Sequence, residues 1–155
     1  CKNGNEIREY TSSGSLVRTI KLLKEHVTYP WHAVQLTDSQ FVVCHWGPVH
    51  GVSLIDERGR VTATYRNSES TQLLNGPRHL TVARNGSILV VDSNITRIVS
   101  LNSSLSSARD LSLTSDTVLN RPRCLYFDES RGRLFVGEYE GERVLIIDNI
   151  NVTFK

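Results

Sequence analysis

An internal repeat of about 45 residues runs along this chain of 155 residues. It is marked by three similar tripeptides at 30–32 (PWH), 77–79 (PRH) and 122–124 (PRC), which begin 47 and then 45 residues apart. Each tripeptide is followed by an alternating run, a turn, an apolar run, a polar corner and a second apolar run. The apolar runs of successive units are Phe41–Val43 with Val52–Ile55, Ile88–Val91 with Arg97–Leu101, and Leu134–Val136 with Val144–Ile147. Short β-prone runs separated by turns at a fixed period predict a series of β-units.

The central unit carries the clearest local signal for antiparallel strands. Asn85-Gly86 stands between two β-prone runs, His79–Ala83 and Ile88–Val91. Both central residues of such a turn need positive φ, which Asn and Gly adopt most readily, so the dipeptide predicts a hairpin. A polar corner then leads to a third run, Arg97–Leu101. We therefore predict three antiparallel strands between residues 75 and 101.

Four short strands in about 45 residues are the pattern of one β-propeller blade. We predict an all-β fold, a partial β-propeller of about three and a half four-stranded blades in a single domain, 1–155. Residues 6–20 are predicted to form an outer half blade, and 30–66 and 77–113 are predicted to form complete blades. Residues 122–155 are predicted to form a nearly complete blade whose outermost strand begins at 152–154.

The number of blades leads to an expectation about assembly. A closed propeller usually has about four to eight blades, so we do not expect this chain to close a ring alone. The chain contains no methionine, and we expect it to be a processed or excised segment. Because open strand edges pair readily with other strands, we expect another copy or a second chain to complete the propeller.

The repeat also has a distinct residue pattern. Residues 77–98 read P-x-x-L-x-V-x-x-x-G-x-I-x-V-x-D-S-x-x-x-R-I, and residues 122–147 follow the same pattern nearly as well. This pattern resembles that of the NHL-repeat β-propeller family, and the resemblance covers most of the chain. Cys44 and Glu138 depart from it by replacing the aspartate after the second strand, and Gly51 stands where Arg97 and Arg143 do. The resemblance implies a propeller that binds protein, RNA or another ligand on one face, and it does not imply catalysis.

The composition fits a single-domain core and points to no special class of partner. Hydrophobic residues make up 39% of the chain, and the formal net charge of +2 is too small to indicate nucleic-acid binding by itself. Lys and Arg are spread along the chain without a run of like charges. No stretch approaches the roughly 18 consecutive apolar residues of a membrane span, so we predict no membrane partner.

The cysteines and the asparagine motifs leave the compartment open. Cys1, Cys44 and Cys124 are odd in number and far apart, which does not suggest a disulfide framework. Four Asn-x-Ser/Thr triplets begin at 85, 94, 102 and 151, all in predicted turns. Cytoplasmic and secreted locations are both consistent with these features.

Propeller geometry groups the candidate site residues on one face. The loops that lead into the innermost strands share a face with the loops that join the second and third strands, and loops displayed on a rigid scaffold commonly carry the ligand. The repeat places Trp31, Arg78 and Arg123 at one equivalent position there. The corner after the second strand adds His45 and Trp46. The predicted ligand-binding face is Trp31, His32, His45, Trp46, Arg78, His79 and Arg123.

His32, His79 and Cys124 occupy the next equivalent position and form a candidate metal set. Imidazole and thiolate are preferred zinc ligands, and a ring of them around the axis would leave an open position for a substrate. Peptidyl-hydroxyglycine lyases, whose propeller is similar to NHL propellers, hold zinc with histidines in their central channel. The resemblance thus implies a metal-dependent, lyase-like enzyme as one alternative. The other interpretation is that each residue packs against the neighbouring blade.

RNA binding is a second alternative, because aromatic planes stack on bases while guanidinium groups contact phosphates. Some NHL propellers bind RNA through such a face. The residues concerned are Trp31, Arg78 and Arg123, with Arg121, Trp46 and His45 nearby. In the competing structural interpretation, Trp31 fills the gap between blades and the arginines pair with the acidic residues of the corners, Asp92, Glu138 or Glu140.

No motif in the sequence points to catalysis. A nucleophile elbow, a Gly-rich phosphate loop, a His-Glu-x-x-His motif and a paired-cysteine metal motif are all missing from it. Cys44 and Cys124 are predicted to be inert, buried packing, and Cys44 directly follows an apolar run. We predict a non-enzymatic scaffold that binds protein through its loop face and blade edges, without a cofactor. RNA binding and a zinc-dependent enzyme remain the alternatives.

Overall fold

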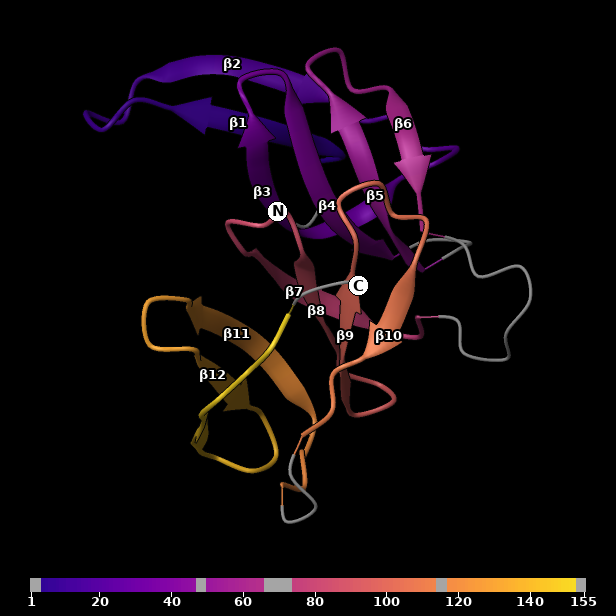
Figure 1. Ribbon diagram of the computed structural model, residues 1–155. Coiled ribbons are helices and arrows are strands. Elements are labelled where there is room, and N and C mark those ends of the chain that lie inside the picture. The colour runs from indigo at the N-terminus through magenta and orange to yellow at the C-terminus, as the bar shows by residue number, and fades with distance from the viewer. Residues whose placement is uncertain (1–3, 47–49, 66–73, 114–116, 153–155) are drawn as a thin grey trace.

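The computed structural model describes residues 4–46, 50–65, 74–113 and 117–152. These residues form β-strands joined by turns and contain no helix (Figure 1). Accordingly, they include no helix long and apolar enough to cross a membrane. The strands are β1 (Glu6–Tyr10), β2 (Leu16–Lys21), β3 (Thr28–Thr37), β4 (Gln40–Trp46), β5 (Gly51–Asp56), β6 (Val61–Thr64), β7 (Pro77–Val82), β8 (Ile88–Asp92), β9 (Arg97–Leu101), β10 (Ala108–Asp110), β11 (Pro122–Asp128), β12 (Arg133–Glu138) and β13 (Val144–Ile147).

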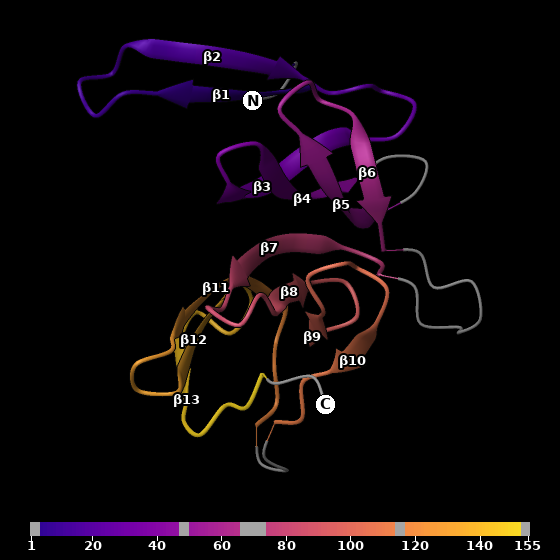
Figure 2. The same ribbon diagram turned by 45° about the horizontal axis from the view of Figure 1, so that its top comes forward.

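The strands form four antiparallel sheets, and within each sheet the strands lie in chain order. The sheets are β1-β2, β3-β4-β5-β6, β7-β8-β9-β10 and β11-β12-β13. They follow one another through the molecule, as Figure 2 shows, and β7 contacts both β3 and β11. Successive sheets packed side by side about their first strands form a β-propeller arrangement. The prediction of an all-β, partial propeller is confirmed.

Three apolar clusters fill the spaces between successive sheets. Strand β8 shows how the sequence achieves this, because Ile88 and Val90 pack toward the β3–β6 sheet while Leu89 and Val91 pack toward the β11–β13 sheet. Side chains alternate between the two faces of a strand, so a run that is apolar at every position buries both faces. This explains why the second strands read as continuous apolar runs.

Cys44 belongs to the same core and is fully buried. Burial raises the pKa of its thiol to about 12, so the group stays protonated and unreactive at neutral pH. The prediction of inert packing for Cys44 agrees with this placement, whereas Cys124 is exposed and the same prediction for it is wrong.

The last sheet has three strands among the described residues. The outermost strand predicted to begin at 152–154 extends outside those residues, because only Val152 of this segment is described. Val152 is buried between the last two sheets, and its carbonyl oxygen accepts a 2.6 Å hydrogen bond from the Ser87 hydroxyl. The chain after β13 therefore contributes to the packing between these sheets.

A buried carboxylate after the second strand fixes the start of the first strand in two of the sheets. Asp92 accepts hydrogen bonds from the backbone N–H groups of Asn75 (2.9 Å) and Gly76 (2.8 Å). Glu138 similarly accepts the Asn120 N–H and pairs with Arg143 at 2.7 Å. These bonds hold the connections that lead into β7 and β11.

In the β3–β6 sheet the equivalent position belongs to His45, which corrects the sequence alignment that placed Cys44 there. His45 pairs with Pro30 across the strands, as Asp92 pairs with Pro77. His45 follows Pro30 by 15 residues, as Asp92 follows Pro77, and a register shift follows the proline in both sheets. His45 also pairs with Gly51, and its imidazole lies 3.6 Å from where a Cβ on Gly51 would be, an ordinary contact distance.

Candidate functional site

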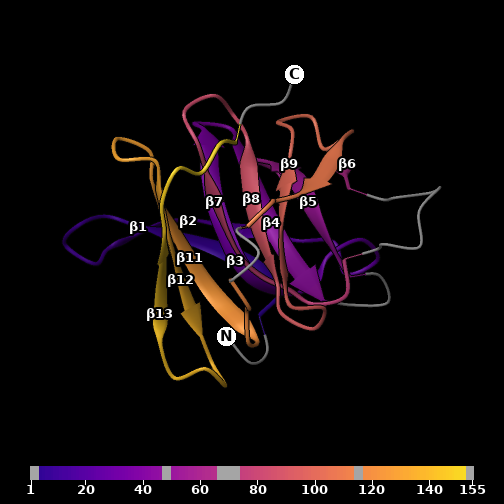
Figure 3. The ribbon, with the colours of Figure 1, turned by 60° about the horizontal axis from the view of Figure 1, so that its bottom comes forward.

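The first strands β3, β7 and β11 lie side by side, as Figure 3 shows, and each begins beside the corner that follows its second strand. The starts of these strands and the corners beside them contain the residues of the predicted ligand-binding face, which stays a prediction. Its exposed or half-buried aromatic and arginine side chains form what we call the aromatic–arginine face. Its residues are Trp31, Trp46, His50, Arg78, Arg123 and Tyr139.

Arg78 is the centre of this face. Its guanidinium carbon lies 4.1 Å from the ring centroid of Trp31 and 4.6 Å from that of Trp46. The two indoles pack edge to face at 5.9 Å, and Trp46 stacks on His50 at 4.8 Å. Each cation–π contact contributes about 0.5–1 kcal/mol at an exposed site. Side chains from β3, β4 and β7 are thereby held in one arrangement.

Arg123 repeats the same contact on the neighbouring sheet. Its guanidinium carbon lies 3.9 Å from the ring centroid of Tyr139, and the Tyr139 side chain is 58% exposed. Neither Trp31, which is 50% exposed, nor Tyr139 fills a gap in the core. The structural interpretation of Trp31 as a filler between blades does not fit this exposure.

The acidic residues that were candidate partners for the arginines are engaged elsewhere. Asp92 holds two backbone N–H groups and contacts Arg97. Glu138 pairs with Arg143, and Glu140 pairs with Arg121. Within the described residues, Arg78 and Arg123 have neither an ion pair nor a hydrogen bond. Only Arg121 of the three arginines has the acidic partner that the structural interpretation requires.

The face is electropositive around Arg78. Burial lowers the pKa of this guanidinium, and the nearby charges of Arg123 and Arg121 lower it further. Like charges repel unless an anion lies between them. The arrangement is therefore suited to a negatively charged group.

His32 and His79 lie next to each other, with ring centroids 3.7 Å apart and planes 20° apart. His32 Nδ1 accepts a hydrogen bond from the Leu80 backbone N–H at 3.4 Å. The lone pairs of imidazoles lie in the ring planes, so two stacked rings direct them side by side and not toward one point. Cys124 lies over Gly137 of its own sheet. No three His, Cys, Asp or Glu side chains of the described residues are grouped to hold a metal ion, and the zinc set stays a prediction.

His45 lies beneath the face and supports it. Its side chain is buried, and its Nε2 is 2.9 Å from the Ser53 hydroxyl, which in turn lies 3.0 Å from the Thr64 hydroxyl. Burial, with a contribution from nearby His50, lowers the pKa of His45 to about 4. His45 was expected to contact a ligand, and in this conformation it is covered.

We expect the protein to lose stability between about pH 6.5 and pH 4. Burial lowers the pKa of His79 to about 4, with His32 adding to the effect, and His45 has a similarly low value. The unfolded chain therefore binds protons at higher pH than the folded chain, so stability is present above 6.5 and falls with acidification. Urea unfolding midpoints at pH 7 and pH 5 measure this.

In the variant His45→Gln, the urea concentration at the unfolding midpoint should decrease less between pH 7 and pH 5 than it does in the original chain. Glutamine keeps a polar group near the Ser53 hydroxyl but does not titrate. His26→Gln removes an exposed histidine and serves as the control. Its urea midpoint should decrease between pH 7 and pH 5 as much as that of the original chain. An equal loss in His45→Gln and the original chain would show that His45 does not drive the effect.

An open hollow of about 440 Å³ adjoins the Arg123 side of the face. Arg123 and Tyr139 form one side of it, and Glu142 contributes an exposed carboxylate. The remaining lining residues are Cys124, Gly137, Glu138, Arg143 and Val144. This hollow gives a partner side chain a place beside Arg123.

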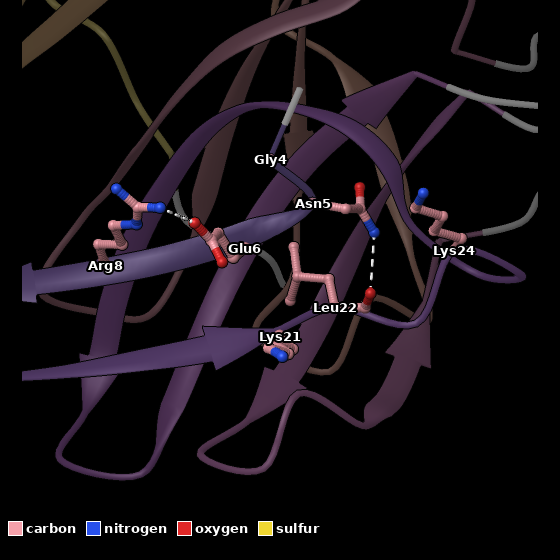
Figure 4. A pocket seen from close by; sticks show the side chains of 7 residues that line it. All are labelled: Gly4, Asn5, Glu6, Arg8, Lys21, Leu22 and Lys24. Carbon is pink, nitrogen blue, oxygen red and sulfur yellow. Dashed lines mark hydrogen bonds and ion pairs between the residues drawn. The ribbon is translucent and has the colours of Figure 1, made fainter. Parts of the chain in front are cut away.

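A second hollow, of about 500 Å³, is lined by residues of β1, β2 and the segments next to them, none of which belongs to the aromatic–arginine face (Figure 4). Its lining contains no aromatic residue. The Asn5 amide donates to the carbonyl oxygens of Leu22 and Val27, and Arg8 pairs with Glu6. These polar groups already serve the packing of the first sheet, so this hollow is a weaker candidate than the face.

The fold is similar to that of two solved β-propellers. Virginiamycin B lyase from Staphylococcus aureus matches with a TM-score of 0.58 and 15% identity, over 95% of this chain and 50% of that chain. A chain of the nidogen/laminin complex matches with a TM-score of 0.65 and 15% identity, over 93% of this chain and 51% of that chain. The chain spans about half the length of these propellers. At this identity the similarity shows the fold alone.

The sequence itself matches no protein-family model and no curated protein. Function must therefore be argued from the side chains of the face.

Proposed function

We propose that this chain is a non-enzymatic, NHL-like binding scaffold that holds a protein partner on the aromatic–arginine face. The observation that supports this most directly is the ordered stack of Trp31, Arg78 and Trp46. Trp, Tyr and Arg dominate the binding energy of protein interfaces, and side chains already held in place lose little conformational entropy on binding. A rigid, exposed set of these residues is what a protein-binding face requires.

The fold comparisons are consistent with a scaffold role and equally with an enzyme. One similar structure is a complex of two proteins, nidogen and laminin, and the other is a lyase. The aromatic–arginine face has stacked aromatic and guanidinium groups at its centre. Such groups bind and orient a partner, whereas the stacked His32–His79 pair offers no converging ligand set. Protein binding is therefore the preferred function.

RNA binding is a second candidate, supported by the position of Arg78 between two indole rings close to Arg121 and Arg123. Bases stack on such planes, and phosphates bind guanidinium groups. Against this, the carboxylates of Glu140 and Glu142 lie in the adjoining corner, and Glu140 already pairs with Arg121. A phosphate backbone carries repeated negative charge, which these carboxylates repel.

We expect Trp46→Ala to weaken peptide binding by at least about tenfold, because it removes one of the rings that hold Arg78. Binders would be selected from a random linear peptide display library on the immobilised protein and measured with synthetic peptides. Tyr10→Ala removes an exposed aromatic ring on β1, outside the face, and should bind normally. Equal affinities of the Trp46→Ala and original proteins would place the site elsewhere. Gel shifts with mixed RNA pools at low salt address the second candidate.

A further inference from the structure

Three buried N–H donors of the aromatic–arginine face have no hydrogen-bond partner among the described residues. They are Arg78 Nε, Arg123 Nε and Trp46 Nε1. More than about nine in ten buried polar groups in folded proteins are paired, and an unmade bond to a charged donor is costly. Three of the unpartnered side-chain atoms of the described residues thus lie on one face, where an acceptor from another molecule would meet the two arginines.

The donors belong to a part of the face with excess positive charge. Arg121 is neutralised by Glu140, whereas Arg78 and Arg123 have no acidic partner within the described part of the chain. Arg123 and Arg78 lie on the adjacent strands β11 and β7, which contact each other. A single anionic group beside them would accept hydrogen bonds and neutralise charge together.

We infer that the face binds the carboxylate of an acidic residue of its protein partner, held by Arg78 and Arg123 with the Trp46 N–H nearby. This rests on the proposed function and adds the chemistry of the partner. A carboxylate has two acceptor oxygens and matches the paired donors of a guanidinium group. Arg78 is already fixed by its two indole contacts, so binding does not have to order its side chain.

The surroundings favour a carboxylate on a peptide over a nucleic-acid phosphate. Trp31 and Tyr139 expose large rings on either side, which suit the apolar neighbours of an acidic residue in a peptide. Glu142 lines the hollow next to Arg123, and its carboxylate repels the repeated negative charges of a phosphate backbone. A side-chain carboxylate and a chain-terminal carboxylate share this chemistry, and the experiment separates them.

The experiment uses peptides selected from the random display library, resynthesised with a free or an amidated C-terminus. Binding is followed by intrinsic fluorescence, since the chain has two tryptophans and both lie in the face. Each Asp or Glu of the peptide is changed to Asn or Gln, and the protein is changed to Arg78→Gln with Arg123→Gln. Arg84→Gln, which removes an exposed guanidinium outside the face, is the matched control. Arg78→Lys keeps the charge and loses the planar group.

We expect one acid-to-amide change in the peptide to weaken binding to the original protein by at least about tenfold. The same change should have little effect on the double variant, because the partner group is already removed. Arg84→Gln should behave as the original protein, and Arg78→Lys should bind with intermediate affinity. Loss of binding on C-terminal amidation alone would support the carboxylate and assign it to a chain end.

Three results would contradict the carboxylate site or the face that holds it. Selected peptides that need no acidic residue, bind the double variant normally and are weakened by Trp46→Ala would overturn the carboxylate site and leave the protein-binding face intact. Peptide binding that is unaffected by both Trp46→Ala and the double variant would overturn the proposed face itself. Displacement of the peptide by inorganic phosphate at lower concentrations than by acetate, with retention of RNA at low salt, would replace the carboxylate with a phosphate ligand. Circular dichroism and urea midpoints confirm that each variant is folded.

Discussion

Replacing Gly59 by alanine is expected to lower the free energy of unfolding by about 3 kcal/mol. Gly59 lies in the turn between β5 and β6 with φ of 80°, a region that a residue with a Cβ adopts at a cost. A Cβ here would also lie 1.9 Å from the carbonyl oxygen of Lys21 on β2. The turn cannot move away easily, because the Asp56 carboxylate accepts the backbone N–H groups of Arg58 and Arg60.

Gly14→Ala separates the two contributions to this effect. Gly14 also has positive φ, at 85°, and a Cβ added there would have no atom within 4 Å beyond its chain neighbours. It should therefore lose only the conformational part, about 1 kcal/mol. Urea unfolding of both variants at one temperature gives the difference. Equal losses would show that the turn after β5 does not press on β2, and that the first two sheets are not in close contact there.

The all-β fold was predictable because every unit of the repeat contains the same pattern of apolar runs separated by turns. A strand that is buried on both faces must be apolar at every position, and β4 and β8 are largely so. The turn at Asn85-Gly86 joins β7 and β8 as predicted, but only Gly86 has positive φ, at 83°, so the expectation of positive φ at both residues was wrong. The hydrophobic pattern and the position of the turn nevertheless agreed. This consistency is the strongest basis for predicting a fold from one sequence.

Register was harder to predict than the existence of strands. The sequence alignment placed Cys44 opposite the buried carboxylates of the other units, whereas His45 occupies that position. His45 follows Pro30 by 15 residues, as Asp92 follows Pro77, so counting from the proline gives His45, whereas Cys44 was assigned because it directly follows the apolar run. The apolar run in β4 continues through Cys44 into the core, so the end of the run is a poor guide to the register of this strand.

Trp31, Arg78 and Arg123, which the repeat places at equivalent positions, lie near the starts of β3, β7 and β11, and their role in a binding site stays a prediction. The partners of these residues were not predictable, because stacking depends on side-chain direction and on the path of the corners. Tyr139 directly follows β12, and no period in the sequence marks either Tyr139 or His50. The cross-strand pairing of Pro122 with Glu138 was the one signal that would have put Tyr139 beside Arg123.

The sequence also did not allow us to predict which acidic residue pairs with which arginine. Acidic and basic residues are nearly balanced along the chain, so every arginine had a nominal partner. The structure shows that the carboxylates closest to the face serve its framework: Asp92 and Glu138 hold backbone N–H groups. Because these carboxylates are engaged, Arg78 and Arg123 have no acidic partner among the described residues, which is why we propose them for binding.

The second large effect is expected for Asp92→Ala, which should lower the free energy of unfolding by about 3 kcal/mol. The Asp92 side chain is fully buried, and its two oxygens accept the backbone N–H groups of Asn75 and Gly76 at 2.9 and 2.8 Å. Its removal leaves two donors without an acceptor and takes a negative charge from beside Arg97, 3.9 Å away. The connection into β7 then loses its anchor, so Arg78 loses its fixed position and peptide affinity should fall as well.

Asp110→Ala provides the matched control, because Asp110 also pairs with Arg97, at 3.0 Å, but its side chain is 51% exposed. An exposed ion pair contributes between about 0 and 1 kcal/mol, so this variant should unfold close to the original chain and bind peptides normally. Equilibrium urea unfolding and tryptophan fluorescence titrations measure both properties on the same samples. If Asp92→Ala and Asp110→Ala lose similar stability, the backbone hydrogen bonds at Asn75 and Gly76 are not what holds this connection, and the link from the buried carboxylate to the binding face fails with them.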